Sequence, residues 1–183
     1  WLLAAECTHV AMESTGKYWV PVFNLLEGHF TQVLVVNAHH VKAVPGRKTD
    51  VCDAEWLAHL LQHGLLRGSF VPPAPIRELR ECTRYRKQLI RTRADEANRI
   101  QKLLEGANIK LGSVATDILG VSGRAMLAAL VQGETDAPTL AGLAKGRLRK
   151  KQPELVAALT GRSTPPQREL LGHQLAHVAF LDQ

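Results

Sequence analysis

The chain has few cysteines and no long apolar run, and each shortage excludes a class of protein. Its three cysteines, Cys7, Cys52 and Cys82, form no CxxC pair, which argues against a disulfide scaffold or a cysteine zinc site. No stretch approaches the ~18 apolar residues that a membrane-spanning helix needs. The first residues also lack the basic start of a signal peptide. We therefore expect a cytoplasmic protein that has no contact with a membrane.

Positive charge is concentrated in the second part of the chain. Residues 1–74 hold five Lys or Arg against six Asp or Glu, whereas residues 75–183 hold eighteen against eleven. The formal net charge of +6 therefore comes from the second part. A basic region beside a neutral one indicates an anionic partner, most often nucleic acid, although a solubilising surface would show the same charge.

The first part has the pattern of an α/β domain. A short strand at 8–12 precedes a helix at 17–27, which Ser14 or Thr15 can cap. The apolar, β-branched run FTQVLVV at 30–36 predicts a buried strand, and a further helix is expected at 50–63. This order predicts a parallel sheet with covering helices. Two strands are too few for such a sheet, so we expect the chain to be a fragment.

A proline-rich connector at 71–75, VPPAP, separates this region from a helical one. Apolar residues at mixed three- and four-residue spacing predict one helix of about thirty residues from 75 to 105, long enough for a coiled-coil arm. Shorter helices are expected at 113–119, 122–132, 138–144, 147–160 and 165–182, with Ser122 as a cap. The predicted fold class is thus α/β plus all-α.

Three acidic residues are candidate metal ligands. Glu13 stands where the first strand ends, a usual place for a functional side chain in an open sheet. Asp50 and Asp53 are three residues apart at the start of a helix, so both carboxylates share one face. Clustered carboxylates provide the hard oxygen ligands of a two-metal phosphoryl-transfer site. The alternative for the pair is structural, with Asp50 as N-cap and Asp53 in the first turn.

Two segments resemble the most distinctive blocks of the insertion-sequence-110 family of DEDD transposases. They are VAMESTGKY at 10–18 and KTDVCDA at 48–54. The strand end VVN at 35–37 and the arginine-rich segment from Leu79 to Arg99 are also similar to that family. The resemblance implies an incomplete RNase H-like catalytic domain at 1–70 and a helical coiled-coil domain at 76–183.

The resemblance also implies an activity, which is metal-dependent cleavage and rejoining of DNA strands for insertion-sequence mobility, guided by RNA. Glu13 matches the second acid of the family, Asp50 the third and Asp53 the fourth, and together they would hold Mg²⁺ or Mn²⁺. The family's first aspartate and its C-terminal serine domain have no counterpart here. We therefore expect a chain truncated at both ends and inactive by itself.

Basic side chains form the candidate nucleic-acid interface, because the planar fork of arginine suits phosphate. The candidates are Lys17, Lys48, Arg84, Arg86, Lys87, Arg91, Arg93 and Arg99. The resemblance adds a structured guide RNA to DNA as a partner. The alternative is a solvated helix flank with local ion pairs.

Assembly and two competing functions remain open at this point. A long amphipathic helix needs a partner for its apolar stripe, so we expect a homodimer or higher oligomer. A metal-dependent nuclease or Holliday-junction resolvase of the RNase H-like fold would use the same acids. A non-catalytic nucleic-acid-binding dimerisation module would use only the helical region. His59 and His63 have zinc-ligand spacing, but we interpret them as solvated helix positions because a third ligand is missing.

Overall fold

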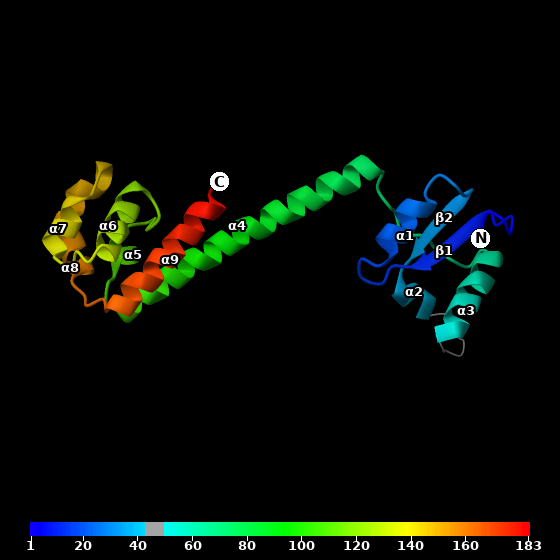
Figure 1. The fold of residues 1–183 in the computed structure, drawn as a ribbon, viewed down its shortest axis with the longest axis horizontal. Helices are drawn as coiled ribbons and strands as arrows, with labels where there is room; N and C mark the ends of the chain where they lie inside the picture. Colours follow the sequence, from blue (N-terminus) through cyan, green and yellow to red (C-terminus); the bar gives the residue numbers. More distant parts are fainter. Residues whose placement is uncertain (43–49) are drawn as a thin grey trace. The chain divides into compact units, whose positions relative to one another are not determined.

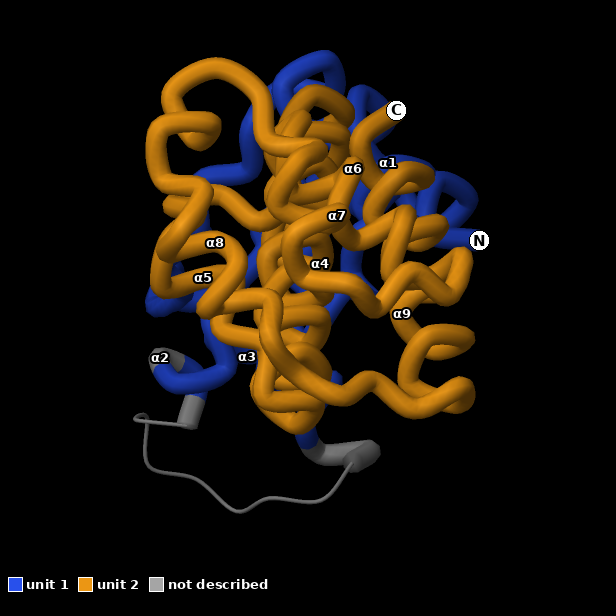
Figure 2. The backbone as a smooth tube through the Cα atoms, turned by 90° about the vertical axis from the view of Figure 1, so that its left-hand side faces the viewer, with its two compact units in different colours: residues 1–77 blue, residues 78–183 orange. Residues whose placement is uncertain are grey.

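The computed structural model describes residues 1–42 and 50–183, and it divides into two compact units, Trp1–Arg77 and Glu78–Gln183 (Figure 2). The division falls inside one helix, α4, which extends over Ala74–Gly106. Lys48 and Thr49 of the second motif lie outside the described residues, as do the side chains of Asp50, Val51 and Cys52. None of the helices in the described ranges combines the length and apolar composition of a membrane span.

Unit 1 contains a two-stranded parallel sheet with helices packed on it (Figure 1). Glu13, the last residue of β1, is paired with Val36, the last residue of β2. α1 packs along β2, and α3 packs along β1. The predicted strand–helix–strand–helix order is therefore confirmed, with one short helix, α2, that the sequence analysis did not predict. The elements are β1 (His9–Glu13), α1 (Trp19–Leu26), β2 (Gln32–Val36), α2 (Ala38–Lys42) and α3 (Asp50–Gln62).

The buried residues of unit 1 gather around β2. Val35 and Val36 are only 2% and 1% exposed, as expected for a β-branched strand covered on both faces. Phe23 of α1 and Leu60 of α3 are buried as well. The predicted cap of α1 was wrong: the helix begins at Trp19, and its N-cap makes no side-chain hydrogen bond.

α4 is a single helix of 33 residues, which confirms the predicted long helix. Proline is tolerated in its first turn because the amide there has no helical partner. Asn108, in the left-handed region with φ 59°, lies just beyond its end, where the amide of Ile109 donates to the carbonyl of Leu104 at 2.8 Å. Its buried residues are all near this end, whereas residues 78–88 are exposed.

Unit 2 surrounds the last turns of α4 with short helices. α9 lies antiparallel to that part of α4 (Figure 1), because Arg93 contacts Asp182 whereas Gly106 lies near Gln167. A capping box between Thr164 and Gln167 starts α9. The remaining elements are α5 (Leu111–Val114), α6 (Val121–Val131), α7 (Ala137–Gly142), the 3₁₀ helix η1 (Gly146–Lys151), α8 (Gln152–Leu159) and α9 (Pro165–Leu181).

The start of α6 differs from the expectation. Gly120, not Ser122, is the N-cap, and Ser122 lies in the first turn, where its hydroxyl accepts from the amide of Lys145 at 2.8 Å. The chain passes very close to itself here, since a Cβ on Gly123 would lie 2.1 Å from the carbonyl oxygen of Ile118. A glycine is therefore required at this turn.

Candidate active site and nucleic-acid interface

Glu13 occupies the carboxyl end of β1, and its side chain is half-buried. The ladder continues one residue further, because the amide of Ser14 donates to the carbonyl of Val36 at 2.9 Å. The hydroxyl of Thr15 donates to Glu13 Oε1 at 2.9 Å. This bond orients the carboxylate, and no hydrogen bond to its other oxygen comes from the described residues. The sequence analysis assigned Thr15 to a helix cap and so missed this contact.

The second part of the acidic site is the amino-terminal half of α3. Asp50 is its first residue and Asp53 belongs to its first turn. The side chain of Asp50 lies outside the described part of the structure, whereas Asp53 is half-buried. Because α3 packs along β1, Asp53 and Glu13 belong to two elements in direct contact. Among the described side chains, no three potential metal ligands form a cluster.

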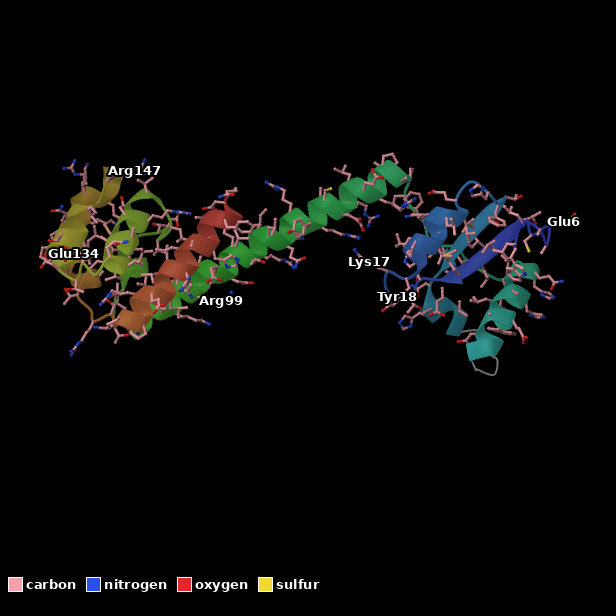
Figure 3. The ribbon with its side chains drawn as sticks, in the orientation of Figure 1. Glu6, Lys17, Tyr18, Arg99, Glu134 and Arg147 are labelled. Carbon is pink, nitrogen blue, oxygen red and sulfur yellow. The ribbon has the colours of Figure 1, made fainter. Side chains whose placement is uncertain are left out.

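Lys17 lies close to Glu13 in sequence, on the exposed turn before α1. It is exposed, as is its neighbour Tyr18, which is 82% exposed (Figure 3). The turn is made by Gly16, whose φ of +55° favours glycine. Lys17 therefore extends from the same β1–α1 turn that holds Thr15 against Glu13.

A basic stripe runs along the exposed part of α4. The face of α4 that packs in unit 2 includes Ile100 and Leu104. At about 100° per residue, Arg84, Lys87 and Arg91 project from the opposite side of the helix. The residues that pack against Ile100 and Leu104 therefore leave these three side chains accessible to solvent. All three are exposed and form no ion pair with a described carboxylate. We call these three residues the α4 stripe; Arg86 is exposed on the packed side.

Two further candidates, Arg93 and Arg99, form ion pairs with carboxylates of unit 2. Arg93 Nε donates to Asp182 Oδ1 at 2.5 Å, and Arg124 binds the other oxygen of the same carboxylate. The bond from Arg93 lowers the pKa of Asp182 most, followed by the bond from Arg124. Arg99 Nη1 donates at 2.7 Å to Glu96, which is only 5% exposed. These two arginines therefore stabilise unit 2.

The histidine pair of α3 behaves as a helix surface. His59 and His63 are exposed, with ring centroids 4.3 Å apart. His63 Nδ1 is hydrogen-bonded to the carbonyl of His59 at 2.8 Å. Trp56 stacks on His59 from the preceding turn. This arrangement fits the interpretation of the histidines as solvated helix positions.

Comparison with known protein families identifies the chain. The family model of the IS110 DEDD transposases, described as a transposase, matches residues 1–109. The chain belongs to the IS110 family of DEDD transposases. No curated protein and no solved structure matches it significantly.

The match gives this transposase its general activity and places the acidic site and the α4 stripe within the family region. IS110 transposases act on DNA in transposition, and DEDD transposases typically use a divalent metal ion. The match includes Glu13, Asp50, Asp53 and the whole of α4. Residues 110–183, which form most of unit 2, lie beyond it.

Proposed function

We propose that the transposase cleaves and rejoins DNA strands with Mg²⁺ or Mn²⁺ held by Glu13, Asp50 and Asp53. The observation that supports this proposal is the position of Glu13 at the carboxyl end of β1. Asp50 and Asp53 belong to the start of α3, and α3 packs along the same strand. Carboxylates at the carboxyl ends of parallel strands are well placed for chemistry. Under this proposal residues 1–70 form an RNase H-like region, and 71–75 connect it to the helical domain at 76–183.

The residues present fit a divalent cation by their chemistry. Glu13 and Asp53 are half-buried carboxylates, and hard cations such as Mg²⁺ prefer oxygen ligands of this kind. When bound, the metal would stabilise the charge that develops on the attacking and leaving oxygens. The protein's own part is to hold the carboxylates in place. Thr15 contributes to this by donating to Glu13.

We also propose that the α4 stripe binds the phosphate backbone of nucleic acid, with Lys17, Lys48 and Arg86 as further contacts. Arg93 and Arg99 remain candidates because their side chains are 37% and 61% exposed despite their ion pairs. Arginine binds phosphate through paired N–H donors. The partners are the DNA substrate and a structured guide RNA, since the stripe offers backbone contacts that either could use.

Assembly through α4 is the third element of the proposal. Leu79 and Ile90 are 58% and 52% exposed, and at about 100° per residue they lie on the side of α4 that packs in unit 2. A second copy of the chain could continue that packing along the free part of the helix as a coiled coil. We therefore propose a homodimer or higher oligomer.

An excision assay with an element that encodes this protein tests the proposal. Replacing Glu13 by Gln should abolish strand cleavage without unfolding the protein. Excision at the normal rate by this variant would exclude the metal site. Cleavage without rejoining by the unmodified protein would favour a nuclease or junction resolvase instead of a recombinase.

A further inference from the structure

A second basic surface lies in residues 145–151, beyond the region that the family model matches. Five of these seven residues are cationic, and all five side chains are exposed. None of them forms an ion pair with a carboxylate in the described part of the chain. We call this set the η1 cluster: Lys145, Arg147, Arg149, Lys150 and Lys151.

Several other cations of unit 2 have local partners, unlike those of the η1 cluster. Arg93 and Arg124 share Asp182, and Lys110 pairs with Glu105. Arg168 donates to the carbonyl of Ser163. Among the described residues of unit 2, cations without an ion pair are densest on η1 and on α4, and Arg162 and Arg168 are single further ones.

The structure holds the η1 cluster in a fixed position. The amide of Lys145 donates to the hydroxyl of Ser122 in α6. Leu148, in the middle of η1, packs against the hydrophobic core, and α8 begins directly at Gln152. The cations thus extend from a short helix that is anchored at its start, middle and end, so little backbone order has to be gained on binding.

Beside η1 lies an open groove of about 460 Å³, lined in part by Thr116, Ser122, Lys145 and Arg147. Figure 3 shows Arg147 on the outside of unit 2. The lining includes one carboxylate, Asp117, whose Oδ1 accepts from the amide of Leu119 at 2.9 Å. Two lining cations and three neighbouring ones outweigh this charge, so an anionic ligand is favoured.

We propose that the η1 cluster and its groove bind the phosphodiester backbone of a nucleic-acid duplex. The inference rests on the proposed function in taking nucleic acid as the ligand, but it concerns a separate surface. The groove has no aromatic lining, whereas proteins that hold single strands stack bases on aromatic side chains. The six residues of η1 extend over roughly 12 Å at about 2.0 Å per residue. That length covers a few phosphates spaced about 3.4 Å along one strand.

The test measures binding of the full chain to a labelled 30-base-pair DNA duplex by fluorescence anisotropy at several salt concentrations. The test variant combines Arg147→Gln with Lys150→Gln. Each lost phosphate contact lowers the log–log salt slope by about 0.9, so we expect a decrease of about 1.8. Affinity at 0.15 M salt should fall by roughly 10- to 30-fold.

A matched control combines Lys110→Gln with Arg162→Gln, which removes the same charge from exposed positions of unit 2 away from η1. This control variant should bind the duplex with an affinity within about twofold of the unmodified chain, because it loses only the long-range attraction of two positive charges, which salt screens. Circular dichroism melting of both variants checks that they fold. Equal behaviour of the test variant and the control would overturn the proposal.

Three further binding measurements show which nucleic acid the η1 cluster binds and whether a loss of affinity comes from this cluster or from the α4 stripe. A 30-base-pair RNA duplex shows whether the η1 cluster serves RNA as well as DNA, and either duplex supports the proposal. An equal loss on a 30-nucleotide single strand would overturn the assignment to a duplex. A variant of the α4 stripe, measured in parallel, distinguishes the two surfaces: if it alone loses affinity, the η1 proposal fails and the proposed function stands. If the unmodified chain binds no nucleic acid, both surfaces fail together.

Discussion

The guanidinium of Arg77 donates to both carboxylate oxygens of Glu27, with Nη2 to Oε2 at 2.5 Å and Nη1 to Oε1 at 3.1 Å. It also donates to the carbonyl of Pro72 at 2.7 Å and lies over the ring of Phe23. Bidentate pairing of this kind fixes geometry as well as charge. The first turn of α4 is thereby fastened to α1 within unit 1.

This pair predicts a pH dependence of the stability of unit 1. The bond from Arg77 lowers the pKa of Glu27 below its usual value of 4.5. A carboxylate with a lowered folded-state pKa contributes stability above its unfolded pKa and loses it as the pH falls through the folded value.

Glu27→Gln should therefore lower the Tm of unit 1 at pH 7 and flatten its dependence on pH below about 5. Scanning calorimetry from pH 7 to pH 3 measures both effects. Glu55→Gln, at an exposed site of α3, is the control, and parallel Tm curves for Glu27→Gln and the unmodified chain would contradict the prediction.

The acidic residues provide the second prediction. Asp50→Asn, Asp53→Asn and Glu13→Gln should each reduce excision at least roughly 100-fold, because a hard cation depends on ligand charge. Asn is a good N-cap, so Asp50→Asn should leave the thermal stability nearly unchanged. Glu55→Gln on the same helix should excise normally. Normal excision by the three variants would leave only a capping role for Asp50.

Thr15 supplies a more specific test of the same site. Thr15→Val keeps the shape of the side chain but removes the donor to Glu13 Oε1. Groups that orient metal ligands typically contribute about 10- to 100-fold to affinity or activity. We expect excision to fall by about 10-fold, with partial recovery at higher Mg²⁺ concentration, and Thr15→Ser to restore it. No change in Thr15→Val would show that the bond does not position Glu13.

The α4 stripe should determine much of the salt dependence of binding. Replacing Arg84, Lys87 and Arg91 by Gln removes three phosphate contacts and should flatten the log–log slope by about 2.7 on duplex DNA. Anisotropy titrations over a roughly sixfold range of salt, from about 50 to about 300 mM, measure the slope. The same number of Gln substitutions at Lys102, Lys110 and Arg162 controls for net charge. An unchanged slope in the stripe variant would remove this surface from the nucleic-acid interface.

Self-association has a distinct signature. Leu79→Lys combined with Ile90→Lys places charge on the free part of the apolar face of α4, where burial of an unpaired charge is unfavourable. Sedimentation equilibrium at tens of micromolar should show an oligomer for the unmodified chain and a monomer for the variant. Leu170→Lys, at a site 50% exposed on α9, should not change the mass. A monomeric unmodified chain would exclude assembly through α4.

Gly123 predicts a structural weak point in unit 2. An added Cβ would lie 2.1 Å from the carbonyl oxygen of Ile118, which backbone atoms cannot accommodate without moving. Gly123→Ala should therefore destabilise unit 2 by at least ~2 kcal/mol. Gly142→Ala, where a Cβ would meet nothing within 4 Å, is the matched control and should be neutral. Denaturant unfolding of both variants decides, and equal stabilities would contradict the packing at this turn.

The sequence by itself determined the local structure of this protein. The β-branched run predicted β2, and the spacing of apolar residues predicted the length of α4, because both depend on short-range periodicity. The two motifs also indicated the family, since their residues and order can be read without coordinates. The basic character of residues 75–183 was equally visible.

Only the tertiary structure decided how individual polar groups are used. Thr15 and Ser122 both had the chemistry of helix caps, yet Thr15 donates to Glu13 two residues earlier, and Ser122 accepts from the amide of Lys145, which is distant in sequence. The arginines of α4 look alike in sequence, but Asp182, at the end of α9, pairs with Arg93, whereas Arg84 and Arg91 are exposed. Such selection depends on contacts between residues far apart in the chain, which no local pattern encodes.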